Sequence, residues 1–201
     1  MRRGPWLIAL VVVPAAVAAQ AAKPASPTVQ APLTESQQIA SALLALPVEF
    51  RETARVLGYK SGAKALAPLR EGAGQFTCLA TEPGQAFHVA CYQNSMEPFM
   101  GRGRELRAQG VTGAQVDTVR FAEVRSGKIA MPKQPAAMYQ LFGGTYDAAR
   151  DVVAGARTLF VIYIPWATPA STGLSDKPAE GTPWIMFAGT PKAHIMLTPK
   201  M

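Results

Sequence analysis

The sequence predicts an α+β domain with a mainly antiparallel sheet and two to four short helices. Three observations lead to this fold class. Short β-prone segments precede and follow a helical middle. Turn pairs such as Pro83-Gly84 separate neighbouring segments, and the two cysteines of the chain flank that pair. The 201 residues suffice for one domain with its own core, which we place at residues 34–201.

The start of the chain predicts export. Arg2 and Arg3 precede the apolar stretch Trp6–Val13 and a run of small residues, which is the pattern of a signal peptide over residues 1–19. The apolar stretch is shorter than the ~20 residues that span a membrane. We therefore expect the leader to be removed, the mature chain to have no transmembrane segment, and the protein to be periplasmic or secreted. Residues 20–33, rich in alanine and proline, predict a disordered linker.

The net charge of the chain gives no support for a nucleic-acid partner. The formal net charge is +7, and loss of the two arginines of the leader leaves 18 basic against 13 acidic side chains. Proteins that bind nucleic acids usually gather such an excess on one face. We interpret the charge as an aid to solubility, with weak attraction to anionic cell-surface polymers as the alternative.

The first part of the domain predicts a helix followed by four strands. Thr34 and Gln37 form a capping box, and an apolar stripe continues to Pro47, so a helix is expected over residues 35–46. The strands that follow are expected to form a meander. They are Ala54–Tyr59, Lys64–Arg70, Gln75–Thr81 and Phe87–Tyr92.

A disulfide between Cys78 and Cys91 is expected. These are the only cysteines, and an exported protein folds under oxidising conditions. They belong to the last two predicted strands, so the bridge would cross a hairpin. Closing so short a loop stabilises a fold by about 3 kcal/mol in the chain-entropy model.

The middle of the chain predicts two helices. Ser95 is placed to cap the first, Pro98 lies in its first turn, and Gly110 ends it. A second helix is expected over Ala114–Ser126. The apolar stripe of the first helix is Met96, Phe99, Met100, Gly103 and Leu106.

The last third of the chain returns to strands. One apolar run in it, Leu159–Ile164, is unbroken, as expected of a central strand covered on both faces. The other expected segments are a strand over Ala137–Phe142, a short helix from its cap Thr145 to about Ala154, a loop over Pro165–Pro183, and a terminal hairpin of Trp184–Ala188 and Ala193–Leu197.

Several short motifs between residues 47 and 198 are distinctive in their residue types. They are Leu69–Gly72, Phe76–Ala80, His88–Tyr92, Ser95–Met100, Arg102–Gly103, Pro183–Met186 and Ala193–Met196. Together they resemble a group of exported bacterial proteins without assigned function. The resemblance implies a family but no activity, cofactor or site.

The two cysteines and the only two histidines are numerically enough for a tetrahedral zinc site. They are Cys78, His88, Cys91 and His194. The twelve residues between the cysteines exceed the spacing of a zinc knuckle, and an oxidising compartment favours the disulfide. Without the thiols, each histidine is expected to be an ordinary hydrogen-bonded residue of the sheet.

Methionines provide the other set of possible metal ligands. Met186 and Met196 are expected close to His194, and thioethers with imidazole are suitable ligands for copper. Met96 and Met100 share a helical stripe with core residues, where methionine usually fills space. We predict no cofactor, and carriage of zinc or copper stays an alternative.

Catalytic motifs are few. In the segment Gly58–Gly62 the serine stands one place too late for a nucleophile elbow. An envelope hydrolase would have to pair Glu97 or Glu71 with His88 or His194. We keep this enzyme as the alternative from another class.

The favoured interpretation is a non-catalytic domain that binds a partner in the cell envelope or a small molecule. The candidate surface is the loop from Trp166 to Trp184, with His194 nearby, because long loops on a rigid sheet often carry binding sites. His88 and Glu97 complete the set of candidate ligand-binding residues.

Overall fold

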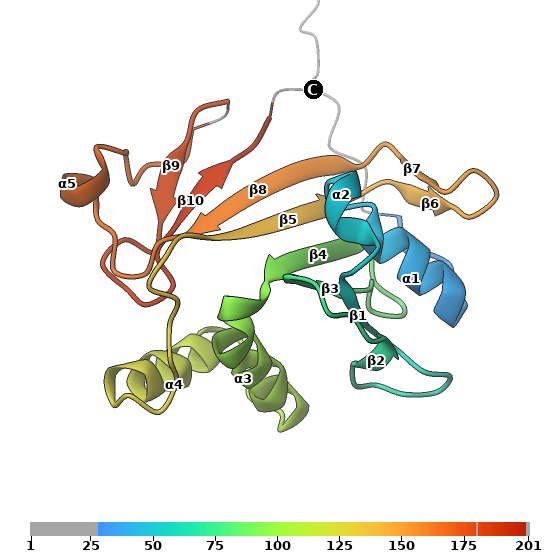
Figure 1. Cartoon of the computed structure of the whole chain (residues 1–201), viewed down its shortest axis with the longest axis horizontal. Coiled ribbons are helices and arrows are strands. Elements are labelled where there is room, and N and C mark those ends of the chain that lie inside the picture. Colours follow the sequence, from blue (N-terminus) through green and yellow to red (C-terminus); the bar gives the residue numbers. More distant parts are fainter. Residues whose placement is uncertain (1–27, 180, 200–201) are drawn as a thin grey trace, which may run out of the picture.

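The computed structural model describes residues 28–179 and 181–199, so the predicted leader lies outside the described residues. Eight strands form one mixed sheet in the order β2-β1-β3-β4-β5-β8-β10-β9, and β6 and β7 form a separate hairpin (Figure 1). The predicted α+β fold is confirmed. The strands of the large sheet are β1 (Arg55–Gly58), β2 (Ala67–Arg70), β3 (Phe76–Leu79), β4 (His88–Gln93), β5 (Ala136–Phe142), β8 (Arg157–Tyr163), β9 (Trp184–Met186) and β10 (His194–Leu197).

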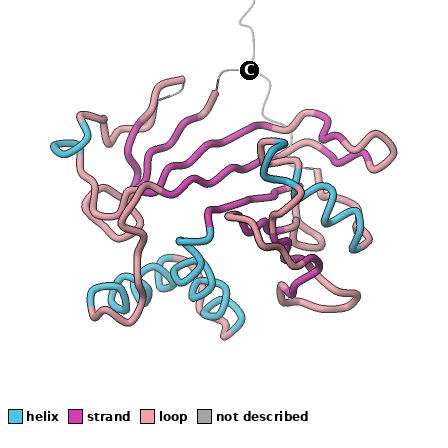
Figure 2. Tube along the Cα trace, in the orientation of Figure 1, coloured by secondary structure: helices cyan, strands magenta, loops and turns pink. Residues whose placement is uncertain are grey.

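The helices cover different parts of the two sheet faces (Figure 2). They are α1 (Glu35–Leu43), α2 (Val48–Arg51), α3 (Glu97–Ala108), α4 (Ala114–Arg125) and α5 (Pro169–Thr172), with a 3₁₀ turn η1 (Asn94–Met96) before α3. Successive side chains of a strand point to opposite faces. Cys91 accordingly packs in the core beneath α1, and Tyr92 packs in the core beneath α3 and α4.

The first helix begins as predicted. Thr34 accepts a hydrogen bond from the backbone of Gln37, and the Gln37 side chain accepts one from the backbone of Thr34. The helix ends at Leu43, earlier than expected. Pro47 is the N-cap of α2, a helix that the sequence did not predict.

Residues 28–33 differ from the predicted linker. Val29 forms a β-bridge with Ala86, and the backbone N–H of Gln30 donates to Gln85 O at 3.0 Å. The buried Gln30 side chain accepts a 2.9 Å hydrogen bond from the backbone of Tyr146. These hydrogen bonds hold a segment whose composition alone favours disorder.

The predicted meander of four strands is wrong. β1 lies between β2 and β3, and it pairs with β3 in parallel. The reason is a close crossing of backbones after β2: the N–H of Gly74 donates to Thr53 O at 2.8 Å, and a Cβ on Gly72 would lie 2.4 Å from that oxygen. Two glycines thus let the chain cross the start of β1 and continue on its other side.

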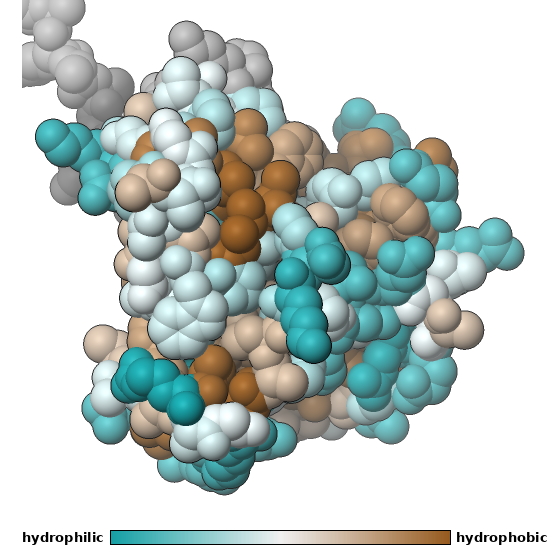
Figure 3. Space-filling model, turned by 60° about the vertical axis from the view of Figure 1, so that its left-hand side comes forward, coloured by the Kyte–Doolittle hydropathy of each residue, from teal (hydrophilic) through white to brown (hydrophobic). Residues whose placement is uncertain are grey.

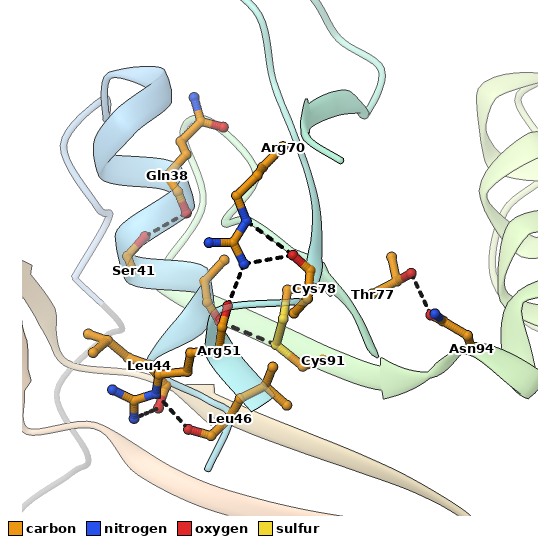
Figure 4. Close-up of a disulfide and its surroundings, with 12 residues drawn as sticks. Gln38, Ser41, Leu44, Leu46, Arg51, Arg70, Thr77, Cys78, Cys91 and Asn94 are labelled. Atoms are coloured by element: carbon orange, nitrogen blue, oxygen red, sulfur yellow. Dashed lines mark hydrogen bonds between the residues drawn. A yellow bond between two sulfur atoms is a disulfide. The ribbon is translucent and has the colours of Figure 1, made fainter. Parts of the chain in front are cut away.

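The predicted disulfide is confirmed. Cys78 and Cys91 are directly opposite each other on β3 and β4. Figure 4 shows this disulfide. The Cys91 sulfur lies 3.3 Å from the carbonyl oxygen of Ala42 on α1. The bridge therefore joins the central strands directly beneath the first helix.

The predicted helices of the middle are present, but Ser95 does not cap α3. A 3₁₀ turn precedes the helix, and the Gln93 side chain accepts a 2.7 Å hydrogen bond from the Ser95 backbone. Pro98 lies in the first turn, and Gly110, at φ +84°, follows the end of the helix, as predicted. The second predicted helix is α4.

The short helix predicted from Thr145 to Ala154 is wrong. The segment is a hairpin of β6 (Thr145–Asp147) and β7 (Val152–Ala154). The backbones approach so closely that a Cβ on Gly144 would lie 2.2 Å from Ala154 O. The Asp147 side chain accepts the backbone N–H groups of Ala149 and Arg150, which satisfies the turn without a helix.

In the C-terminal part the predicted strands are present, but one of them is more exposed to solvent than predicted. β9 and β10 form the predicted terminal hairpin. β8 is an inner strand of the sheet, yet it is not covered on both faces, because Phe160 is 36 % exposed. Within the described part of the chain, no helix has the length and apolar content needed to cross a membrane.

Candidate functional site

The candidate site is a groove on the sheet face that carries α3 and α4. These helices cover the end of the face around Tyr92 and Tyr163 and leave the end around His88 and Phe142 open. A groove of about 800 Å³ occupies this open end. One wall is the later part of α3, and the other comes from the β1–β2 and β3–β4 connections. We call it the basic groove.

Apolar side chains form the floor of the basic groove. They come from four adjacent strands and include Leu79, Ala90, Phe142 and Leu159. An apolar floor with a few polar groups at its edge is the usual composition of a small-molecule site, and the volume lies within the usual range of such sites.

His88 stands at the edge of this floor. It is the first residue of β4, its side chain is exposed, and its Nε2 lies 2.8 Å from Oε1 of Gln140 on β5. With a proton on Nε2, the ring donates to the amide oxygen. This leaves Nδ1 and the Gln140 amide nitrogen as groups for a bound molecule.

Three arginines give the groove its charge. Arg104 and Arg107 come from α3, and Arg157 comes from the first residue of β8. The Arg157 guanidinium lies over the ring of Phe142, 4.7 Å from its centroid. Glu82 is the one carboxylate among the described lining residues, so the edge is positive overall.

The arginines differ in how far they are neutralised. Arg104 donates to Glu97 at 2.5 Å and to the Tyr92 hydroxyl at 2.7 Å. No carboxylate among the described residues lies within ion-pair distance of Arg107 or Arg157. Arg107 Nη1 donates to Gly103 O at 3.1 Å. The other N–H groups of Arg107 and the Arg157 guanidinium are left to pair with an anionic molecule.

Glu97, a predicted site residue, supports the groove from behind. It accepts hydrogen bonds from Arg104 and from the fully buried Tyr92. Burial raises the pKa of Tyr92, so the phenol stays a neutral donor to Glu97. The cluster fixes the position of Arg104 at the wall of the groove.

His194, the other predicted histidine, lies far from His88. Their strands are separated by β5 and β8, and the pairing register places them at opposite ends of β5. Regular strand geometry then separates them by roughly 20 Å along the strands and roughly 14 Å across them. His194 is 5 % exposed, its Nδ1 lies 2.7 Å from Lys192 O, and burial lowers its pKa.

The loop from Trp166 to Trp184 lies at the other end of the sheet from the basic groove. Trp166 is 47 % exposed, and Trp184 is half-buried on β9. The loop contains α5 and is fastened to β9 by a 2.8 Å hydrogen bond from Ile185 N to Ser175 O. Figure 3 brings the side with α5 and β9 forward and shows two apolar areas separated by paler and hydrophilic side chains. The role of this loop in binding stays a prediction.

The geometry does not assemble the zinc set or the Glu/His pairs of the hydrolase, whereas Met186 of the copper set lies directly opposite His194 on β9 and β10. Both sulfur atoms of the expected zinc set are in the disulfide, and no group of three His, Cys, Asp or Glu within the described residues is arranged to hold a metal. Glu71 pairs with Arg55, and Glu97 pairs with Arg104. Neither carboxylate is hydrogen-bonded to a histidine in the described part of the chain.

Most of the basic groove was missed by sequence reasoning. His88 and Gln140 are 52 positions apart, and Arg157 is brought to α3 only by the order of the strands. Arg104 and Arg107 are one turn apart on α3, outside the apolar stripe of that helix. Two arginines near the end of one helix were the only local signal.

Comparison with known proteins gives no further information on this site, because no family model, curated protein or solved structure matches the chain.

Proposed function

We propose that this protein is an exported, non-catalytic binding domain that holds a small anionic molecule with an apolar part in the basic groove. One observation carries the proposal: guanidinium groups from α3 and β8, two of them without a described carboxylate partner, border an apolar floor. The predicted leader and the disulfide support the exported location.

Charge and shape together favour an amphipathic anion. A guanidinium presents a planar set of donors that matches a carboxylate or a phosphate. The apolar floor beside it favours a ligand that also buries hydrocarbon. A purely ionic ligand would leave the floor unused.

Binding without catalysis is favoured by the surroundings of His88. Its hydrogen-bond partner is the Gln140 amide, which cannot take up a proton as a carboxylate would. General acid–base catalysis needs such a titratable partner or a nucleophile within hydrogen-bond reach. The geometry therefore supports recognition better than the Glu/His hydrolase.

The test is calorimetric titration of the mature protein with N-decanoylglycine and with its methyl ester, which lacks the charge. We expect the acid to bind and the ester to bind at least about ten times more weakly, since a hydrogen bond to a charged group contributes ~1.5–3 kcal/mol. Arg157→Gln should weaken binding of the acid by about tenfold.

The matched control is Arg125→Gln, which removes the same charge from an exposed position outside the groove. It should leave affinity nearly unchanged. Equal affinity for the acid and the ester, or equal losses in the two variants, would contradict the proposal.

A further inference from the structure

A second cavity borders the basic groove. It has a volume of about 530 Å³ and lies between the segment leading into α1, the turn after β1 and the turn after β3. Tyr59 and Glu82 line both cavities. The two hollows therefore meet at these two side chains.

The boundary between the cavities is fixed in place by Gln38. This residue is 6 % exposed, its Oε1 accepts the backbone N–H of Tyr59 at 2.8 Å, and its Nε2 donates to Tyr59 O at 2.9 Å. A Cβ on Gly58 would lie 2.7 Å from the Gln38 oxygen, so the adjacent glycine makes room for this contact. The shape of the junction is thus built by buried polar contacts.

The two cavities differ in charge. The basic groove carries Arg104, Arg107 and Arg157, whereas the second cavity carries Glu35 and Lys60. The Glu82 carboxylate lies at the boundary and lines both cavities. Burial raises the pKa of Tyr59, and the negative charge of Glu82 raises it further. The Tyr59 phenol is therefore neutral and lies within the field of Glu82.

We propose, on the basis of the proposed function, that the two cavities form one elongated site for a short peptide with free termini. Its carboxylate would lie at the arginines, an apolar side chain on the floor of the basic groove, and its amino group beside Glu82. The opposite charges of the two ends fix this direction. A peptide of three to five residues extends over ~10–17 Å.

Peptide chemistry fits the junction better than a simple acyl chain does. Tyr59 and Glu82 line both cavities, and the exposed Gln85 lines the basic groove, so polar side chains are present along the site. An extended peptide carries donors and acceptors along its whole length, whereas an acyl chain would leave these groups without partners.

The test is calorimetric titration of the mature protein with the tetrapeptide Ala-Leu-Leu-Ala in three forms: free, N-acetylated and C-amidated. We expect N-acetylation and C-amidation each to weaken binding at least fivefold. In Glu82→Gln the free and acetylated peptides should bind equally, while the effect of amidation persists. Arg157→Gln should show the reverse pattern.

The control is Glu52→Gln, which removes an exposed carboxylate away from both cavities and should change none of these ratios. If the acetylated peptide binds as tightly as the free one, the elongated site is wrong. If N-decanoylglycine binds but no form of the peptide does, the peptide proposal is overturned while the proposed function stands. If neither compound binds, both are overturned.

Discussion

Single residues show how this fold places polar groups away from water. Gln38, Thr77 and Arg120 are buried, and each has a defined polar partner: the backbone of Tyr59, the side chain of Asn94 and the carbonyl of Phe99. A buried polar group without a partner is costly. Their positions therefore tie separate segments together.

Replacing Gln38 with alanine should destabilise the protein by ~1–3 kcal/mol. The change leaves the N–H and C=O of Tyr59 without their partners at a partly buried position. Urea unfolding followed by circular dichroism measures the effect. Gln115→Ala, at an exposed position on α4, is the control and should change stability by less than about 0.5 kcal/mol. Equal stability of the two variants would contradict the role of Gln38.

Glu123 should make the stability of the protein depend on pH in the acid range. Hydrogen bonds from Arg102 and then from Lys128 lower its pKa to about 2, from 4.5 for a free side chain. A lowered pKa in the folded state stabilises the fold above pH 4.5, and this contribution is lost as the pH falls from 4.5 toward 2.

Glu123→Gln should accordingly reduce the loss of unfolding free energy between pH 5 and pH 2.5. Urea unfolding at several pH values measures this slope. Glu52→Gln, which changes an exposed carboxylate, should leave the slope almost as in the wild type. A wild-type slope in Glu123→Gln would show that the ion pair does not contribute.

At the scale of elements, Arg120 makes a close contact between α3 and α4. Arg120 of α4 lies over the ring of Phe99, 3.9 Å from its centroid, and its guanidinium passes beside Gly103 of α3. A Cβ at Gly103 would lie 2.8 Å from Arg120 Nη1. The glycine in the middle of α3 is therefore required by helix packing.

Gly103→Ala and Gly101→Ala should have opposite effects. Alanine gains about 1 kcal/mol over glycine in a helix, and the Cβ of residue 101 would meet only the flexible ends of Glu97 and Arg104, at 3.2 and 3.4 Å. At residue 103 the new Cβ must displace a buried arginine, and overpacking costs ~1–3 kcal/mol. Thermal unfolding should show a raised Tm for Gly101→Ala and a lowered one for Gly103→Ala. The same sign in both would contradict the packing argument.

Elements defined by local chemistry could be predicted from the sequence. The capping box of Thr34 and Gln37, the apolar stripe of α3 and the paired cysteines act within a few residues or across one hairpin. The β6–β7 hairpin was mistaken for a helix because Thr145 is an acceptable N-cap. What decides that segment is the contact between Gly144 and Ala154, which no local pattern shows.

At the scale of the whole molecule, the order of the strands creates the basic groove. β1 lies beside β3 only because the chain crosses at Gly72 and Gly74, and this order brings Tyr59 to the edge of the cavity. The pairing of β4 with β5 then places Gln140 beside His88, although the two residues are 52 positions apart. Sequence spacing carries no information about such neighbours. Of the predicted site residues only His88 lines the basic groove, and the predicted binding surface is the loop of Trp166.

The same long-range order separates the two histidines. His88 lies at one end of the sheet and His194 at the other, and only His88 borders the basic groove. The two regions are far enough apart to give separate signals in a binding experiment. A residue-resolved measurement can therefore distinguish the groove from the loop.

The most direct test is an NMR titration of the ¹⁵N-labelled mature protein with N-decanoylglycine. The predicted result is a set of saturable shifts in the backbone amides at the start of β4, the end of β5, the start of β8 and the last turns of α3. Shifts confined to the loop from Trp166 to Trp184, or no saturable shifts at millimolar ligand, would contradict binding in the basic groove.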